Sequence, residues 1–361
     1  MPSRAGITLS RRDGLLAGIA VLASSAANAG TTTGKIRLSL NENSFGPSPR
    51  VRHAIEAELA HLNRYVNEDE ANALATQIAA LERVAPAQVV IGDVLGPLGV
   101  HLGLGRSGGG NVVYSTPGYT ELTDAGAAVG VVGRGIALNA ALENDLPALA
   151  GAIDAQTLAV SLVNPHNPSG TVNAVDAFDA FIRTASSRAL VIVDEAYLEY
   201  DDAFERRTAV RLVREGLNVL VFRTLAKAYG LAGLPIGYAI APAPLAAELR
   251  AAGISSPHTL DRLAVAAARA ALGDQGHVQL VRQAIAVQRG RIHRTLDRLG
   301  WRHSDSQADF VFFAPPDPDR LRQRFAAAGI AIGRPFPPLD RWVRITVGTP
   351  RETDRVLAIL A

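Results

Sequence analysis

Residues 223–234 read Arg223-Thr224-Leu225-Ala226-Lys227-Ala228-Tyr229-Gly230-Leu231-Ala232-Gly233-Leu234, directly after a short apolar run. Lys227 and Lys35 are the only lysines of the chain, although lysine and arginine together number 36. An arginine can replace a lysine on a surface, but its guanidinium cannot form an imine with an aldehyde. Lys227 is therefore a candidate for chemistry that needs an amine. A surface lysine without a role is the alternative, and the neighbouring motifs must decide.

Two other motifs also follow directly on short apolar runs, namely Asn164-Pro165-His166-Asn167-Pro168-Ser169-Gly170 and Asp194-Glu195-Ala196-Tyr197. The carboxyl ends of parallel strands meet at one edge of a sheet, where α/β proteins bind their ligands. We therefore expect Asn167, Asp194 and Lys227 to face a common crevice. For the aspartate alone, a helix N-cap is an equally common role.

An amine, a carboxylate and an amide at one crevice are the set that a carbonyl cofactor with a pyridine ring needs. The amine forms an imine, the carboxylate keeps the ring nitrogen protonated, and the amide donates to the phenolate oxygen. His166 lies in the same segment, but no second histidine stands at the spacing of a metal-ligand pair. We therefore expect no metal site.

The chain between residues 85 and 241 alternates short apolar runs with amphipathic stretches. Bounded runs rich in Val, Ile and Leu are typical of buried strands in a mostly parallel sheet. The pattern predicts a doubly wound α/β domain with helices over 69–83, 174–184 and 208–215. Its predicted strands are 88–91, 111–114, 130–133, 158–163, 189–193, 218–222 and 236–240.

From about residue 244 the pattern changes to long segments rich in Ala, Leu and Arg, which predict helices over 260–272 and 278–299. Two further strands are predicted over 310–313 and 343–347, so a smaller α+β domain is expected here. Residues 35–50 look like an extended arm that leads into the first helix. We therefore expect a leader (1–29), an arm (30–50), a large domain (51–243) and a small domain (244–361).

The leader contains Ser10-Arg11-Arg12, the apolar run 15–23 and Ala27-Asn28-Ala29. This order is typical of a twin-arginine export signal with a small-residue cleavage site, which predicts a periplasmic protein free of the membrane after cleavage. The apolar run is well short of the ~20 residues that cross a bilayer, so a permanent anchor is the weaker interpretation. Gly14 stands where such signals prefer Phe. An inefficient signal, which would leave the protein in the cytoplasm, and a disordered N-terminus are the alternatives.

Composition narrows the classes of function further. The whole chain has a formal net charge of +2, and the three arginines and one aspartate of residues 1–29 account for it. The remainder is near neutral and shows no basic face, so a nucleic-acid partner is not expected. The chain has no cysteine, which excludes disulfides, thiolate metal sites and cysteine nucleophiles.

Taken together, the motifs resemble those of the fold type I, class I and II aminotransferases that use pyridoxal 5′-phosphate (PLP). The similarity rests on Asn-Pro-Ser-Gly (167–170), Asp-x-Ala-Tyr (194–197) and Lys-x-Tyr-Gly-Leu-Ala-Gly-Leu (227–234) in this order. It extends from about residue 36 to the C-terminus. The arm Leu40-Asn41-Glu42-Asn43-Ser44-Phe45-Gly46-Pro47-Ser48-Pro49 is similar to that of the histidinol-phosphate aminotransferase branch.

The resemblance implies a role for each matching position around the ring. Lys227 would be the Schiff-base lysine and would move the proton between Cα and C4′ once substrate frees it. Asp194 would contact the pyridinium nitrogen, while Asn167 and Tyr197 would bond the ring oxygen O3′. Tyr119, in Pro-Gly-Tyr, would stack on the ring.

At the other positions the resemblance implies contacts to phosphate and substrate. Thr224 and the backbone at Val94 and Leu95 would hold the cofactor phosphate. Tyr65 would reach that phosphate from a neighbouring subunit, which implies a homodimer with shared sites. The remaining matches are to the substrate: Arg344 would grip its carboxylate, with Arg334 and Asn43 as further contacts.

The sequence pattern itself also suggests a functional role for Arg344, because this charged residue interrupts an otherwise apolar predicted strand. A solvated arginine on an edge strand is the alternative.

One end of the site departs from the family. Eight residues after the lysine, the family usually has an arginine that clamps the phosphate, and here stands Pro235. Ala226 replaces the usual serine, and Gly92-Asp93-Val94-Leu95-Gly96-Pro97 lacks the usual serine and acidic pair. A lost charge-assisted contact costs about 1.5–3 kcal/mol. We therefore expect a functional but loosely held cofactor.

The expected activity is amino transfer between an amino acid or amino-alcohol phosphate, histidinol-phosphate-like or aromatic, and a 2-oxo acid. A PLP-dependent decarboxylase or another enzyme acting at Cα is the first alternative, because the same electron sink serves all these reactions. A degenerate binding protein that keeps the fold is the second. A nucleotide-dependent dehydrogenase is disfavoured, since no G-x-G-x-x-G follows the first strand.

Overall fold

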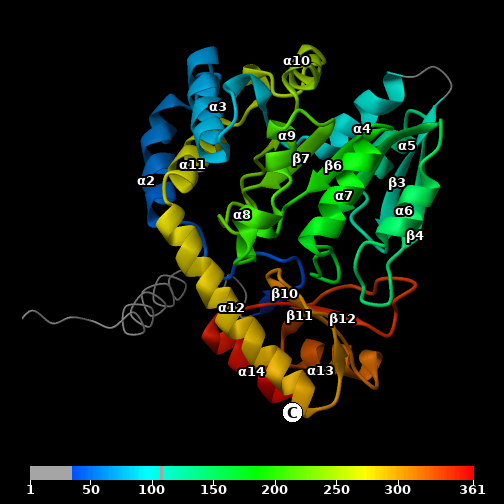
Figure 1. Cartoon of the computed structure of the whole chain (residues 1–361). Helices are drawn as coiled ribbons and strands as arrows, with labels where there is room; N and C mark the ends of the chain where they lie inside the picture. Colours follow the sequence, from blue (N-terminus) through cyan, green and yellow to red (C-terminus); the bar gives the residue numbers. More distant parts are fainter. Residues whose placement is uncertain (1–34, 106–108) are drawn as a thin grey trace, which may run out of the picture.

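The computed structural model describes residues 35–105 and 109–361 (Figure 1). The predicted export signal lies outside these described residues. Within them, no helix is both long and apolar enough to cross a bilayer.

The described part of the chain contains a seven-stranded sheet in the order β2-β8-β7-β6-β5-β3-β4. Neighbouring strands are parallel, except that β8 runs antiparallel to both β2 and β7. The predicted doubly wound, mostly parallel sheet is therefore confirmed. Its strands are β2 (Val89–Ile91), β3 (Gly110–Thr116), β4 (Val131–Ala137), β5 (Thr157–Val163), β6 (Leu190–Asp194), β7 (Val219–Thr224) and β8 (Gly237–Ile240).

The central strands are buried on both faces, which explains why they read as continuous apolar runs. In β6, Val191 and Val193 belong to one core cluster, and Leu190 and Ile192 belong to the other. Alternate side chains point to opposite faces of a sheet, so helices must cover both. The helices on the first face are α3 (Glu68–Glu82), α6 (Leu146–Ala152), α7 (Val175–Ser186) and α9 (Val210–Arg214), and those on the second are α4 (Leu95–Leu104), α5 (Glu121–Ala127) and α10 (Ala243–Ala251).

The C-terminal part forms a second, smaller layer below the large sheet in Figure 1. Its three-stranded sheet has the order β12-β10-β9 and is antiparallel. Helix α12 (Gln275–Arg298) runs from the upper helices down into this layer (Figure 1). The other elements here are β9 (Arg302–His303), β10 (Phe310–Ala314), α13 (Pro318–Ala327), β12 (Val343–Thr346) and α14 (Pro350–Leu360).

The arm is more structured than the sequence predicts. Its first residues form β1 (Ile36–Leu38), which pairs in parallel with β11 (Ile330–Ile332), almost 300 positions away. Ser48 then caps α2 (Pro49–Glu58) by accepting a hydrogen bond from the amide of Arg50. The start of the arm therefore forms a two-stranded sheet with the C-terminal part of the chain. A strand of three residues is too short for the sequence to predict this pairing.

The predicted division at residue 244 stays a prediction. Two helices beyond it, α10 and α11 (Arg262–Leu272), pack on the side of the large sheet. Helix α11 contacts α2 and α3, and α10 contacts β2. The predicted helices over 260–272 and 278–299 are confirmed as α11 and α12.

Candidate active site

The carboxyl ends of β5, β6 and β7 open into one cavity of about 200 Å³. The three motif residues that sequence predicts at a common crevice, Asn167, Asp194 and Lys227, all line it. Its other lining residues are Asp93, Tyr119, Glu121, Val163, Ala196, Tyr197, Phe222, Thr224, Ala226, Ala232, Pro235, Ile236 and Gly237.

Lys227 lies in the segment between β7 and β8, where it is half-buried. Its Nζ donates to the backbone oxygen of Leu40 at 3.2 Å and lies 5.7 Å from the centre of the Tyr197 ring. Burial lowers the pKa of the amine, because a low-dielectric site disfavours the charged form. A lysine that lines a cavity with a depressed pKa is better suited to attack a carbonyl than a surface lysine without a role.

Asp194 is the last residue of β6 and is 4% exposed. Its Oδ1 accepts a hydrogen bond from the amide of Ala196 at 2.9 Å. The helix N-cap alternative is wrong, because the next helical turn (Leu198–Tyr200) is preceded by Tyr197 at its N-cap. Burial raises the pKa of Asp194 to about 7, and the negative charge of Glu121 adds to this.

Two amides converge on the hydroxyl of Tyr197. Asn41 Nδ2 donates to it at 3.1 Å, and Asn167 Nδ2 lies at 3.5 Å. Sequence reasoning missed Asn41 and chose Asn43 from the same arm. The backbone of Asn41 has φ of 55°, a conformation that asparagine tolerates better than most residues, and its amide donates to Thr346 Oγ1 at 3.0 Å.

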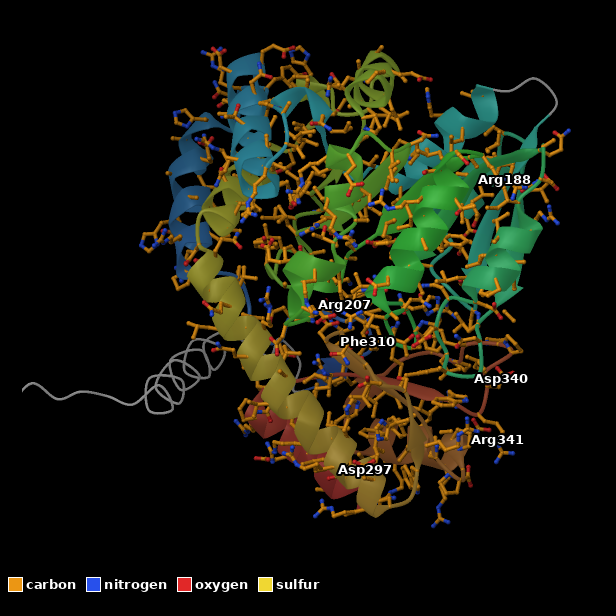
Figure 2. All side chains as sticks on the ribbon, in the orientation of Figure 1. Arg188, Arg207, Asp297, Phe310, Asp340 and Arg341 are labelled. Carbon is orange, nitrogen blue, oxygen red and sulfur yellow. The ribbon has the colours of Figure 1, made fainter. Side chains whose placement is uncertain are left out.

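Arg344 reaches the same group of residues from the small domain. It lies on β12, donates from Nη1 to Asn167 Oδ1 at 2.5 Å and from Nη2 to the backbone oxygen of Ser39 at 3.0 Å. Its guanidinium lies 5.3 Å from the ring centre of Phe310, which Figure 2 shows at the top of the smaller C-terminal layer, facing the large sheet. Although β12 is an edge strand, Arg344 is buried, so the solvated-arginine alternative is wrong.

Arg334 is exposed, but it shares an aromatic neighbour with Arg344. The guanidinium of each arginine lies 4.8 Å from the ring centre of Phe336. The positive charge of Arg334 contributes to lowering the pKa of Arg344, after the larger effect of burial. The two cations therefore flank one aromatic ring, with Arg344 buried and Arg334 at the surface, and neither lines the cavity.

Several predicted residues do not line the cavity. Tyr65 is 78% exposed and contacts His258 edge to face, which leaves its predicted contact with a neighbouring subunit a prediction. Val94 and Leu95 are buried in the hydrophobic core at the start of α4, so only their backbone is available to a ligand. Asn43 donates to the backbone oxygens of Gly46 and Ala228, and thus ties the arm to the lysine segment.

The remaining predicted ring contact, Tyr119, does line the cavity and is half exposed. Its hydroxyl donates to the carboxylate of Glu121. Burial raises the pKa of Tyr119, and this hydrogen bond adds to the rise. Sequence reasoning stopped at Tyr119 and missed Glu121, which lies only two residues further along and also lines the cavity.

Another carboxylate missed from sequence is Asp309, which is fully buried directly before β10. Burial raises its pKa to about 7, opposed by the positive charges of Lys227 and Arg344. Asp309 does not line the cavity. Asp309 belongs to none of the motifs in the sequence, so no local pattern predicts that it lies near the site.

The arrangement fits the ring of pyridoxal phosphate. Asp194 would hold the ring nitrogen, Lys227 the aldehyde carbon, and Tyr197 with its two amide donors the ring oxygen O3′. Thr224 also lines the cavity, but its Oγ1 already accepts a hydrogen bond from the amide of Ala226 at 3.1 Å. Among the described lining residues Lys227 is the sole cation, so the phosphate end fits less well than the ring end. Within the described part of the chain, no group of acidic and histidine side chains could hold a metal ion.

Comparisons with known proteins agree with this geometry. Residues 33–360 match the model of the aminotransferase class I and II family. The chain is 33% identical to the histidinol-phosphate aminotransferase of Limosilactobacillus fermentum over 331 residues, or 90% of each chain. It is 35% identical to the aromatic amino acid aminotransferase of Rhodococcus opacus over 335 residues, or 90% of this chain and 89% of that one.

A solved structure is similar over almost the whole chain. It is the histidinol-phosphate aminotransferase of Sinorhizobium meliloti in complex with pyridoxal 5′-phosphate, with a TM-score of 0.81 and 28% identity. The match covers 98% of this chain and 97% of that one. The chain therefore belongs to the class I and II aminotransferases, and it is an enzyme that uses pyridoxal 5′-phosphate to transfer amino groups.

Proposed function

We propose that this enzyme moves an amino group between a 2-oxo acid and a donor with a flat ring and an anionic group, such as an aromatic amino acid or histidinol phosphate. The observation that carries the proposal is the contact of Arg344 with Asn167. It puts a cation for a substrate carboxylate directly beside the residues that surround Lys227. The names of the similar enzymes support the same two donor classes.

When bound, the cofactor supplies a carbonyl carbon for the amino group and a ring that accepts electrons from Cα. Lys227 would bind that carbon and, once released, would carry the proton between Cα and C4′. The lowered pKa of Lys227 favours proton uptake from Cα, because only the neutral amine can accept a proton. Asp194 would face the ring nitrogen as a carboxylate and would keep the ring in its electron-accepting form.

The substrate side offers two cations and aromatic surface. Arg344 is buried beside the rings of Phe310 and Phe336, and the exposed Arg334 lies over the ring of Phe336. A carboxylate suits the buried, forked guanidinium, whereas a second anionic group, such as a phosphate, suits the exposed one. A buried arginine and an exposed one could therefore bind a substrate with a negative charge at each end. The aromatic rings beside them would suit a substrate with an aromatic ring at one end.

A donor screen tests the proposed substrates. The enzyme loaded with cofactor is mixed with histidinol phosphate, phenylalanine, tyrosine or aspartate, and the loss of the absorption of the lysine adduct is followed. Histidinol phosphate or the aromatic donors should react at least about tenfold faster than aspartate. Faster reaction with aspartate would refute the proposed donor class. Release of carbon dioxide without formation of glutamate from 2-oxoglutarate would favour a decarboxylase instead.

We also propose a homodimer. Three large apolar side chains, Leu59, Leu62 and Tyr65, are more than half exposed on one short segment after α2. Exposed apolar groups that gather in this way often mark a protein interface. Light scattering during size-exclusion chromatography should give twice the chain mass. A Leu62→Asp variant should elute as a monomer, and an unchanged dimer would show that the interface lies elsewhere.

We further propose that the protein is exported in folded form through its twin-arginine segment, which stands at Arg11-Arg12. Export of a folded chain allows cofactor loading in the cytoplasm. Cell fractionation should find the protein in the periplasm, and a double Arg→Lys variant at positions 11 and 12 should remain in the cytoplasm. Equal distribution of the two proteins would refute the proposal.

A further inference from the structure

Besides Asp194, two carboxylates line the cavity, those of Asp93 and Glu121. On a pyridoxal ring, the oxygen O3′ and the phosphate arm stand on opposite sides of the carbon that Lys227 binds. Tyr197, with its amide donors, takes the O3′ side. A phosphate arm would therefore lie on the side of the lysine away from Tyr197, and the cavity wall also includes the acidic residues Asp93 and Glu121.

Glu121 lies against the first turn of α4. A Cβ atom built on Gly96, the second residue of that helix, would lie 3.2 Å from Glu121 Oε1. The N-terminus of a helix carries free N–H groups and a partial positive charge, which normally attract a phosphate. In this protein the carboxylate of Glu121 stands by the first turn of that helix, and Asp93 immediately precedes the N-cap residue Val94.

No basic side chain offsets these charges, because among the described residues of the cavity wall the sole cation is Lys227. Pro235 and Ala226 also line the cavity and offer neither a charge nor a hydroxyl. Two unit charges a few ångströms apart in a partly buried site change a binding constant by about tenfold or more. A phosphate dianion placed here would be repelled by Glu121, whereas an uncharged substituent would not.

We propose that Glu121 is a specificity-determining residue that weakens binding of pyridoxal phosphate relative to pyridoxal, which lacks the phosphate. The inference rests on the proposed role of Lys227 in binding the aldehyde. Its consequence is a site that exchanges its phosphorylated cofactor readily and accepts the unphosphorylated aldehyde with comparable affinity. The hydrogen bond from Tyr119 gives Glu121 a second task, because it fixes the ring that would stack on the cofactor.

Cofactor-free enzyme is titrated with pyridoxal phosphate and, separately, with pyridoxal. The readouts are the absorption of the lysine adduct and the mass gained after borohydride reduction. Glu121→Gln keeps a hydrogen-bond acceptor for Tyr119 but removes the charge. At a pH well above the pKa of Asp194, where that carboxyl is ionised in both proteins, it should tighten pyridoxal phosphate by about tenfold and change pyridoxal by less than twofold.

Asp124→Asn is the matched control. Asp124 lies on the same helix and in the same first turn, but it is exposed and does not line the cavity. This variant should leave both affinities unchanged, and Asp93→Asn should shift them in the same direction as Glu121→Gln. Thermal unfolding of each variant establishes that it is folded.

An unchanged ratio of the two affinities in folded Glu121→Gln would overturn the inference, as would equal tightening of both aldehydes. Failure of the proposed function looks different. In that case neither aldehyde would give a borohydride-stable adduct with the native chain, whatever residue stands at position 121.

Discussion

Arg344 donates a hydrogen bond from Nη1 to the side-chain oxygen of Asn167 at 2.5 Å, across 177 positions of sequence. Arg344 lies on β12 in the C-terminal part of the chain. Asn167 follows the carboxyl end of β5, a central strand of the large sheet. Asn167 in turn approaches the hydroxyl of Tyr197. The cation for the substrate carboxylate is thus linked, through one amide, to the groups that hold the cofactor ring.

Replacing Arg344 by Gln should therefore affect both substrate and cofactor. Loss of the charged fork raises KM for the 2-oxo acid by about a hundredfold, which corresponds to about 2.7 kcal/mol. Release of Asn167 should also shift the absorption of the lysine adduct. Arg341→Gln, an exposed neighbour, serves as the control. Steady-state kinetics with an unchanged KM for Arg344→Gln would show that another residue binds the carboxylate.

The two lysines of the chain allow a clean test of the adduct. Lys227→Ala should abolish the borohydride-fixed mass increase and reduce amino transfer by at least about a thousandfold, because the amine is both the anchor and the base. Lys35→Ala removes the other lysine, which is exposed, and should keep both properties. Mass spectrometry of the reduced protein locates the modification. An adduct that survives in Lys227→Ala contradicts the assignment.

Cofactor binding should weaken in acid through Asp194. Burial raises the pKa of this carboxyl to about 7 in the cofactor-free protein, so below that pH it is protonated and must lose its proton to hold the ring nitrogen. The affinity of the native chain relative to Asp194→Asn should fall by about tenfold per pH unit between pH 7 and 5. Fluorescence titration of both proteins across this range gives the ratio. A constant ratio would mean that Asp194 is ionised throughout.

Asn41 should act on the cofactor only through Tyr197. Asn41→Gly removes the side chain and tolerates the positive φ of this position. Since the hydrogen bond to Tyr197 is lost, we expect cofactor affinity to fall by about three- to tenfold. Tyr197→Phe should cause a similar loss, and the double variant little more than either one, because the two share one interaction. Additive losses would assign Asn41 a separate role.

Because no cation besides Lys227 is among the described residues that line the cavity, we expect the cofactor phosphate to be held weakly. Extensive dialysis should remove much of the cofactor from the native enzyme. Pro235→Arg adds a cation to the cavity wall and should slow the loss by about tenfold, whereas Pro235→Ala should not. Residual absorption of the adduct during dialysis measures both rates. Full retention by the native enzyme would contradict the expectation of a loosely held cofactor.

Sequence alone determined the elements of the large sheet and the ring end of the site. The seven apolar runs became β2 to β8. The central strands are buried on both faces and need uninterrupted apolar residues, which is a local requirement, whereas the edge strand β4 is mostly not buried. The motifs at residues 167, 194 and 227 follow such strands directly. Parallel strands present their carboxyl ends at one edge, so their convergence followed from strand direction alone.

Only the tertiary structure decided the contacts between segments far apart in the chain. The pairing of β1 with β11, the bond from Asn41 to Tyr197 and the approach of Glu121 to Gly96 each join residues whose own neighbourhoods carry no periodic signal. Such contacts depend on how the small domain, the arm and helices α4 and α5 pack together. Packing is set by the summed shape and burial of many side chains, which no short stretch of sequence contains.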